Sequence, residues 1–407
     1  MQSQPRFFRD GKYLLLFGFS AVFMGNFGQS FYLGGYGASI QQSLDLSASA
    51  YGLIYSLATL AAGSCLMVVG GFIDKISLFR FTSYVSVGLL IASLLFVFSS
   101  NVWVLLAAFF LVRLCGQGLL PHTGITTMAR CFSADRGKAI SVAACGVPVG
   151  EIILPLLAAI LISLVGWQNS WLFVTLLVPL IFLPLSYLLL RNAQQKGFDF
   201  MPAKNSLRQG DNPQGRAEVL RDKRFWRALP AVLMAPFLVT GLFIQQSFFM
   251  AEKQWSLQLF ALGFIVYGLV HWLSSLVAGV IVDKFTAVRV LAFYNLPMLL
   301  AMVLVAFYSG DYMAFVLLGL LGVSIGFSGP VTGALWAEVY GTVKIGSIRS
   351  MTTSFGVWST SLSPVLFGVL IDKGVSLATL CLSLAAAIFV AGILAFFSYR
   401  LKDFNPV

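Results

Sequence analysis

The chain has 407 residues, of which 58% are hydrophobic and only 10% are charged, and its mean hydropathy is +0.89. This composition excludes a soluble globular protein, in which about a quarter of the residues would carry a charge. The net charge of +11 would suit a nucleic-acid partner, but the positions of the basic residues, given below, exclude that class. The apolar runs do not alternate in polarity as the strands of a transmembrane β-barrel do. The sequence therefore predicts an all-α membrane protein.

Twelve apolar segments are long enough to cross a bilayer as helices, which takes about 20 residues each. In chain order, we expect them at residues 13–38, 50–73, 80–99, 102–127, 138–164, 169–190, 225–250, 258–282, 288–308, 312–338, 346–370 and 376–399. A polar stretch rich in Gly, Pro, Asn and charge separates the first six from the last six, and its composition suits a flexible linker. We therefore expect an N-terminal six-helix half over residues 1–190, a linker over 191–224 and a C-terminal six-helix half over 225–407.

The basic residues predict the orientation of these helices. All Lys and Arg residues except Lys253, Lys373 and Arg113 fall in the termini, in the even-numbered connections or at the helix ends beside them. Because Lys and Arg are enriched in cytoplasmic loops, we expect both termini and the linker in the cytoplasm. The chain would then be a multi-pass protein of the bacterial inner membrane, surrounded by lipid and without a nucleic-acid partner.

One short motif, Gly-x-x-x-Asp-Lys-x-x-x-x-Arg, occurs twice at an offset of 209 residues. Its two copies consist of Gly70, Asp74, Lys75 and Arg80, and of Gly279, Asp283, Lys284 and Arg289. The same offset relates Pro121, Thr123 and Gly124 to Pro330, Thr332 and Gly333. An ordered set of matches at one offset indicates a duplicated membrane unit. Secondary transporters are built from such repeats and bind their cargo between them.

The repeated motif resembles the signature of the major facilitator superfamily, Gly-x-x-x-Asp-Arg/Lys-x-Gly-x-Arg/Lys-Arg/Lys, although Ser77 stands where the inner glycine is usual. The resemblance covers essentially the whole chain and implies the twelve-helix fold of that family, with two pseudo-symmetric halves. In the family, the acid of the motif caps a helix of the other half and latches the outward-facing state. Asp74 would then face the start of segment 346–370, and Asp283 the start of segment 138–164. The alternative is that these residues only end helices at the membrane surface.

Four ionisable residues lie inside predicted helices, namely Arg113, His122, Glu151 and His271. A charge inside the bilayer is costly unless it is paired or hydrated, so such residues usually mark function. Arg113 lies near the midplane of its helix, and Gln117 follows one turn later on the same face. A fixed cation beside an amide suits an anionic or carbonyl-bearing cargo. The alternative is that Glu151 neutralises Arg113 and that the pair only holds two helices together.

Glu151 and His271 are the candidates for coupling transport to protons. A buried acid keeps its negative charge most easily beside a cation, so the protonation of Glu151 would depend on whether cargo occupies Arg113. His271 could relay a proton or ligate a metal ion, since imidazole titrates near neutral pH; alternatively it is a hydrogen-bonded core histidine. His122 lies near the cytoplasmic end of its helix, where we expect it in the gate or at the interface.

Neutral polar residues on the first and seventh predicted helices are further candidates for binding the cargo. They are Asn26, Gln29, Tyr32, Gln245 and Gln246. An offset of 217 residues relates the run Gln-Ser-Phe-Tyr that begins at Gln29 to the run Gln-Ser-Phe-Phe that begins at Gln246. These two amides would therefore approach a central site from the two halves.

Within the superfamily, the chain resembles the bacterial CcoA-like branch, which includes a copper importer and a riboflavin transporter. The resemblance rests on Phe27–Phe31, Gly146–Glu151, the Arg113–Gln117 run and Leu229–Pro236. The copper members are marked by paired Met residues in helix 7 and a His-x-x-x-Met in helix 8. Here Met234 has no Met partner one turn away, and Ser275 stands where that Met is expected after His271. Since Cu(I) prefers sulfur ligands, the missing sulfurs count against copper.

These observations predict a secondary active transporter that moves a small organic solute, with anionic or carbonyl groups, by alternating access coupled to protons. The alternative is a copper importer that uses His271 and Met234. The aqueous segments show no metal-binding cluster, nucleophile motif or phosphate loop, so we expect no enzyme and no cofactor. One chain with two halves is a complete unit, so we expect a monomer.

Overall fold

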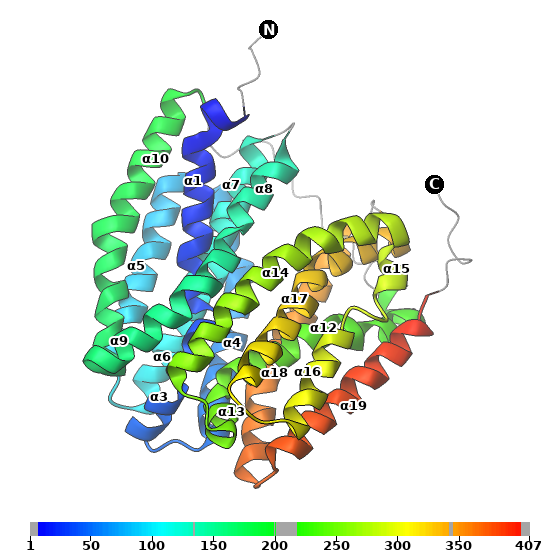
Figure 1. Ribbon diagram of the computed structural model, residues 1–407. Coiled ribbons are helices and arrows are strands. Elements are labelled where there is room, and N and C mark those ends of the chain that lie inside the picture. Colours follow the sequence, from blue (N-terminus) through cyan, green and yellow to red (C-terminus); the bar gives the residue numbers. More distant parts are fainter. Residues whose placement is uncertain (1–6, 133–134, 199, 201–217, 342–344, 400–407) are drawn as a thin grey trace. The chain divides into compact units, whose positions relative to one another are not determined.

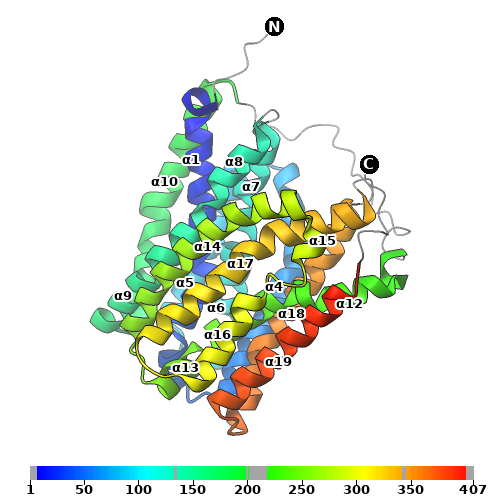
Figure 2. The ribbon, with the colours of Figure 1, turned by 45° about the vertical axis from the view of Figure 1, so that its right-hand side comes forward.

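The computed structural model describes residues 7–132, 135–198, 200, 218–341 and 345–399. Every regular element within these ranges is a helix (Figures 1 and 2). Ten helical runs are long and apolar enough to cross a membrane. One run, Arg136–Gln195, breaks at Gly166, where φ is 80°, and so supplies two crossings; the shorter apolar helix Leu296–Phe307 supplies another. The prediction of an all-α membrane protein with twelve crossings is confirmed.

The chain divides into two compact units. The first comprises Met1–Leu46 and Leu57–Ser206, and the second comprises Ser47–Ser56 and Leu207–Val407. Residues 201–217, which are half of the predicted linker, lie outside the described residues. The boundaries predicted at residues 190 and 224 therefore stay a prediction.

The helices that belong mainly to the first unit come in this order: α1 (Phe7–Gly25), η1 (Asn26–Gly28), α2 (Ser30–Gly34), α3 (Gly37–Ser43), α4 (Ala48–Val69), η2 (Gly70–Asp74), α5 (Leu78–Val97), α6 (Val102–Leu111), η3 (Val112–Leu119), α7 (Leu120–Cys131), α8 (Arg136–Ala144), α9 (Gly146–Leu177), η4 (Val178–Phe182) and α10 (Leu183–Gln195). The elements η1 and η2 are short 3₁₀-helices, whereas η3 and η4 are π-helical. The first turns of α4 belong to the second unit.

The helices of the second unit follow: α12 (Lys223–Ile244), α13 (Gln246–Lys253), α14 (Leu257–Phe285), α15 (Ala287–Val290), α16 (Leu296–Phe307), α17 (Tyr312–Tyr340), α18 (Ile345–Asp372) and α19 (Leu377–Phe396). Among these, α14 and α17 form the most extensive contact, and they lie side by side in both views of the ribbon (Figures 1 and 2).

Several helices begin at a polar side chain that accepts a hydrogen bond from the backbone of the first turn, as N-cap residues do. These residues are Ser77, Asn101, Ser256 and Ser376. Ser77 is the residue that replaces the usual glycine of the motif. Its φ is −61°, and its hydroxyl accepts from the amide of Arg80. Ser77 therefore caps α5 with its side chain. Its negative φ is one that any residue can adopt, so this turn does not require glycine.

Several of the helices predicted as continuous are interrupted, including the following three. Segment 13–38 is broken by η1, after which Gln29 is extended. Segment 225–250 is broken at Gln245, between α12 and α13. Segment 288–308 keeps only α15 before a turn, and α16 then starts with Pro297 in its first turn, a position that suits proline because its missing amide hydrogen is not needed there. Hydropathy cannot reveal such breaks, because it reports how apolar a segment is and not the dihedral angles of its backbone.

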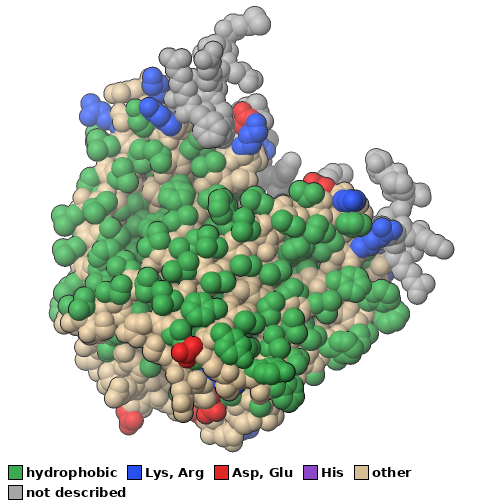
Figure 3. Space-filling view, in the orientation of Figure 1, with side chains coloured by type: hydrophobic (Ala, Val, Ile, Leu, Met, Phe, Trp, Pro, Cys, Tyr) green, Lys and Arg blue, Asp and Glu red, His purple; other side chains and the backbone are tan. Residues whose placement is uncertain are grey.

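The outer surface of the second unit is strongly apolar, as a surface in contact with lipid must be. Large hydrophobic side chains such as Val280, Phe293 and Phe307 are more than half exposed. Figure 3 shows hydrophobic side chains over most of the face it presents, with Lys and Arg gathered at helix ends. This distribution agrees with helices that cross a bilayer and end at its charged interface.

A polar cluster joins the start of α12 to the ends of α17 and α19. Asp222 accepts hydrogen bonds from the backbone amide of Arg224 (2.9 Å), from its side chain (3.1 Å) and from the hydroxyl of Tyr340 (3.1 Å). The hydroxyls of Tyr340 and Tyr399 lie 2.9 Å apart, and the guanidinium of Arg224 lies over the Tyr399 ring. Partial burial alone would raise the pKa of Asp222, but these hydrogen bonds outweigh it and leave the pKa below its ordinary value.

Replacing Asp222 with asparagine should lower the melting temperature of the purified protein at pH 7. Because the pKa is lowered on folding, the carboxylate contributes stability above its unfolded pKa of about 3.9 and loses it as the pH falls through the folded value. The difference between wild type and Asp222→Asn should therefore shrink as the pH approaches 3, in melting curves from pH 7 to 3. Tyr312→Phe, at an exposed tyrosine, is the control. A difference that stays constant with pH would contradict this role.

Candidate functional site

The short helix η1 is the centre of a polar site inside the first unit. The side-chain amide of Asn26 donates to the carbonyl of Gly146 on α9 at 2.7 Å. On its other side, η1 approaches η3 so closely that a Cβ on Gly28 would overlap the backbone of Val112 and Gln117. Glycine is the residue that permits such an approach. Thus η1 is held between η3 and α9.

Arg113 extends from η3 into this centre. Its side chain is buried, with 3% of the residue exposed. The guanidinium donates from Nε to the hydroxyl of Thr59 on α4 at 3.1 Å and from Nη1 to the carbonyl of Gly28 at 3.0 Å. These two acceptors hold the guanidinium in one orientation. The π-helical turn that carries it is a feature frequently found at functional sites.

Glu151 lies on α9, directly after a residue that contacts η1. It is also 3% exposed, and it follows Gly150, whose Cβ position is occupied by the side chain of Asn26. The break in the first helix thus contacts both the turn that carries Arg113 and the turn that precedes Glu151. Gln117 is half-buried at the other end of η3, where its backbone amide abuts Gly28. The structure therefore brings Asn26, Arg113, Gln117 and the Glu151 turn together around η1.

Tyr32 and Gln29, which were also predicted to bind cargo, lie outside the contacts between η1, η3 and α9. Tyr32 is buried in an aromatic cluster, where its ring contacts Tyr36 and Trp171 and its hydroxyl lies 2.9 Å from that of Tyr36. The Tyr32 hydroxyl is therefore hydrogen-bonded to Tyr36 inside the protein. Gln29 is half-buried at the start of α2. Their role in binding cargo stays a prediction.

In the first unit, the motif residues contact the end of α7. Asp74 and Arg130 form an ion pair, and Nε2 of His122 lies 3.2 Å from the carbonyl oxygen of Gly70. The ammonium of Lys75 lies over the ring of Phe72. His122 and the motif therefore belong to one cluster. The contact of Asp74 with a helix of the other half stays a prediction.

In the second unit, the corresponding turn is held by an acid from α17. Glu338 accepts hydrogen bonds from the amides of Ala287 (2.9 Å) and Val288 (3.2 Å), the first residues of α15. Thr286, just before them, has a φ of 72°, which is a strained value for a β-branched residue. The motif residues Asp283, Lys284 and Arg289 are exposed around this turn, and Gly279 lies half-buried before it.

Gln245 and Gln246 are buried at the break between α12 and α13. The amide nitrogen of Gln245 donates to the carbonyl oxygens of Ala48 (2.8 Å) and Pro364 (3.0 Å), so this side chain fixes backbone within the second unit. Gln246 is 1% exposed, and its amide oxygen has no hydrogen-bond partner among the described residues. Gln246 is therefore the better of the two candidates for a polar contact with cargo, a role that stays a prediction.

His271 lies where α14 packs closely against two glycines of α17. A Cβ on Gly326 would be 2.7 Å from the His271 carbonyl oxygen, and one on Gly322 would be 3.2 Å from its amide nitrogen. The imidazole is half-buried, with its ring centre 6.0 Å from that of Tyr267. Met234 lies half-buried on α12. Proton relay by His271 and the copper alternative both stay predictions.

A polar pocket of about 350 Å³, which none of the sequence patterns predicts, lies within the second unit. Hydroxyl groups from α17 and α18 line it together with Arg349, whose guanidinium donates to the carbonyl of Gly333 at 2.6 Å. The hydroxyl-bearing residues are Ser328, Thr332, Thr352 and Thr353. In the sequence, Arg349 does not differ from the other basic residues near cytoplasmic helix ends. The spacing of Ser328 and Thr332, one turn apart, was the available signal for a polar helix face.

Comparisons with known proteins agree with the fold described above. The family model for the Major Facilitator Superfamily matches residues 16–259. No curated protein matches the chain by sequence.

Solved structures match over nearly the full chain. A bacterial homologue of the human lysosomal transporter Spinster, inward-facing and unoccupied, has a TM-score of 0.72 at 17% identity, covering 98% of this chain and 99% of the other. The same homologue in an occupied state has a TM-score of 0.71 at 15% identity, covering 99% and 100%. A mutant of the nucleoside transporter NupG has a TM-score of 0.72 at 15% identity, covering 95% and 100%. At these identities the likeness shows the fold.

Proposed function

The chain belongs to the major facilitator superfamily, and from that premise we propose that it moves a small organic solute with anionic or carbonyl groups by proton-coupled alternating access. The family and the neighbouring structures show a membrane transporter rather than an enzyme. The solute class and the proton coupling are the proposed part.

The buried guanidinium of Arg113 carries the proposal for the solute class. Arg113 is a permanent cation that is 3% exposed, and hydrogen bonds to Thr59 and Gly28 orient its guanidinium. An anionic or carbonyl group of a cargo would supply a further charge-assisted hydrogen bond at the same cation. The amide of Gln117 and the hydroxyl-lined pocket at Arg349 favour the same class of solute.

Glu151 is the proposed site of proton coupling. It is buried in the same centre, and a carboxyl group there is neutral when protonated and charged when not. An anion bound at Arg113 would reduce the attraction between Arg113 and the Glu151 carboxylate, and protonated Glu151 would then be favoured. Cargo and proton would then load together, which is the requirement for symport.

Replacing Glu151 with glutamine tests the coupling. Glutamine keeps the shape of the protonated acid but cannot release a proton, so we expect uphill accumulation driven by a pH gradient to be lost while counterflow exchange of the cargo is retained. The cargo is first identified as the compound that raises the melting temperature most, in a panel of organic anions, nucleosides, flavins and Cu(I). Transport is then measured in proteoliposomes with and without a pH gradient.

Glu252→Gln, at an exposed acid of α13, is the matched control and should keep both activities. Unchanged uphill accumulation by Glu151→Gln would reject the coupling role and leave the solute class standing. Stabilisation by Cu(I) alone would instead favour the copper alternative of His271 and Met234.

We also propose that the protein is a monomer of the bacterial inner membrane with both termini in the cytoplasm. The clustering of basic residues at the termini and in residues 191–224 supports this orientation. Labelling of single cysteines in the two termini, in intact cells and in inverted vesicles, would test it.

A further inference from the structure

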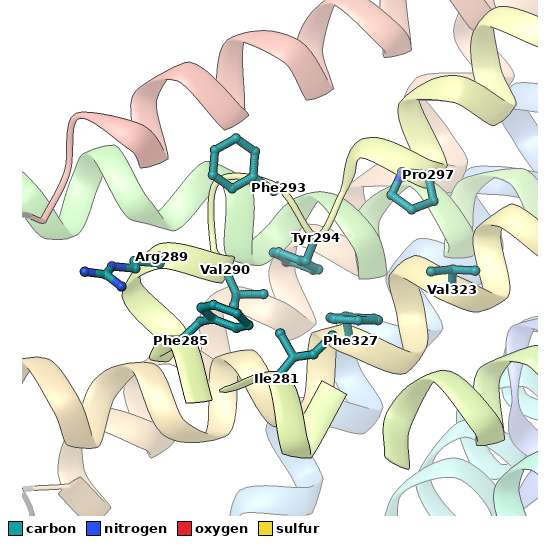
Figure 4. A pocket seen from close by; sticks show the side chains of 9 residues that line it. All are labelled: Ile281, Phe285, Arg289, Val290, Phe293, Tyr294, Pro297, Val323 and Phe327. Atoms are coloured by element: carbon teal, nitrogen blue, oxygen red, sulfur yellow. The ribbon is translucent and has the colours of Figure 1, made fainter. Parts of the chain in front are cut away.

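A cavity of about 390 Å³ lies within the second unit (Figure 4). It is formed by the end of α14, by α15, by the turn before α16 and by the middle of α17. Its lining consists of Ile281, Phe285, Arg289, Val290, Phe293, Tyr294, Pro297, Val323 and Phe327.

The lining is apolar except at one end. Tyr294 contributes its ring, because its hydroxyl is used in a hydrogen bond of 2.6 Å to the carbonyl of Ala231. Arg289 lies at the edge, and its guanidinium points away from the ring cluster (Figure 4). The cavity thus combines an apolar channel with a single cation at its mouth.

The cavity opens onto the lipid-facing surface of the unit. Phe285 and Phe293, which line it, are 45% and 54% exposed, and Val280 and Leu296, each next in the chain to a lining residue, are exposed as well. In a membrane protein such a surface meets acyl chains. Arg289 stands at the end of α14 that carries the basic motif, where lipid headgroups lie.

Arg289 is available for a ligand. It makes no hydrogen bond or ion pair within the described part of the chain, and it is exposed. Its position is set by α15, whose first amides are held by Glu338. Because the carboxylate of Glu338 is occupied by these amides, it is not paired with the arginine.

We propose that this cavity binds an anionic phospholipid, with one acyl chain between Phe285, Phe293 and Phe327 and the headgroup phosphate on Arg289. The occupant is argued from charge complementarity and from the continuity of the cavity with the lipid-facing surface. A guanidinium forms paired hydrogen bonds with phosphate oxygens, and a basic residue near an anionic membrane surface favours such lipids.

Native mass spectrometry of the full-length protein tests this proposal. Wild type should retain phosphatidylglycerol in preference to phosphatidylcholine when it is released from mixed micelles. Arg289→Ala should reduce this retention by about fivefold, and Arg289→Lys should keep part of it. Val323→Trp, which fills the channel but leaves the arginine, should reduce retention of both lipids. Arg136→Ala removes an exposed arginine of the first unit that lines none of these cavities, and it should behave as wild type.

Melting curves identify any variant that fails to fold. If Arg289→Ala does not fold, Arg289→Lys takes its place in the comparison of lipid retention with wild type. Equal retention by Arg289→Ala and Arg136→Ala would overturn the proposal. Retention of free glycerol phosphate as strong as that of phosphatidylglycerol would also overturn the proposal, because the acyl chain would then contribute nothing to binding. Self-association of the protein through this face, lost in Val323→Trp, would assign the cavity to a second copy of the chain and reject the lipid.

Discussion

Replacing Arg113 with glutamine is expected to weaken cargo binding strongly. The variant keeps a hydrogen-bond donor but loses the charge, and a hydrogen bond to a charged group contributes about 1.5–3 kcal/mol. Cargo affinity should therefore fall by roughly 10- to 100-fold. The measurement is the shift in melting temperature as a function of cargo concentration, combined with initial uptake rates in proteoliposomes.

Arg113→Lys separates charge from geometry in the same assay. Lysine keeps the charge but cannot donate to Thr59 and Gly28 from one planar group, so it should bind more weakly than wild type and more tightly than the glutamine variant. Arg136→Gln, at an exposed arginine of α8, should change neither quantity. An Arg113→Gln variant that melts lower but binds cargo as tightly as wild type would show that the arginine only holds helices together.

Replacing Gly28 with alanine should strongly destabilise the first unit. The new Cβ would overlap the backbone of Val112 and Gln117, and backbone atoms cannot move aside as the end of a flexible side chain can. Overpacking of this kind costs about 1–3 kcal/mol. The shift of η1 would also move the carbonyl that holds Arg113, so we expect both a lower melting temperature and weaker cargo binding.

Gly137→Ala is the matched control, because a Cβ at that position meets nothing within 4 Å. It should melt at the wild-type temperature or slightly above, since alanine favours a helix more than glycine does. A Gly28→Ala protein as stable as this control would mean that η1 and η3 can separate without cost.

The sequence predicted the fold because hydropathy and charge report directly on membrane crossing. Each helix long enough to span the bilayer must be apolar, and Lys and Arg must collect on one side. Neither rule depends on which helices touch. The break at η1 and the π-helical turn at η3 depend on local packing between Gly28 and Val112, so the sequence alone could not locate them.

The candidate site was predicted in part for the same reason. Arg113, Glu151 and Asn26 stand out in the sequence because polar residues are rare inside membrane helices. In the structure Asn26 lies on η1, and Arg113 and the residue before Glu151 contact that element. Tyr32 stands out for the same reason, but its hydroxyl lies against Tyr36 inside an aromatic cluster. Arg349 does not stand out, because it lies near a helix end, where basic residues are common. A polar residue inside a membrane helix is therefore a candidate for binding cargo. Only the packing around it shows whether its polar group is bonded within the protein or faces a pocket.

The glycines that face His271 limit which substitutions the second half of this chain can accept. Gly322 and Gly326 occupy the positions that the 209-residue repeat relates to Arg113 and Gln117. In one half these positions carry the proposed contacts to cargo, and in the other they let α14 and α17 meet at van der Waals distance. Natural variation should therefore be tolerated differently at the two pairs. Changes at 113 and 117 would give transporters of altered preference, whereas changes at 322 and 326 would be removed by selection against misfolding.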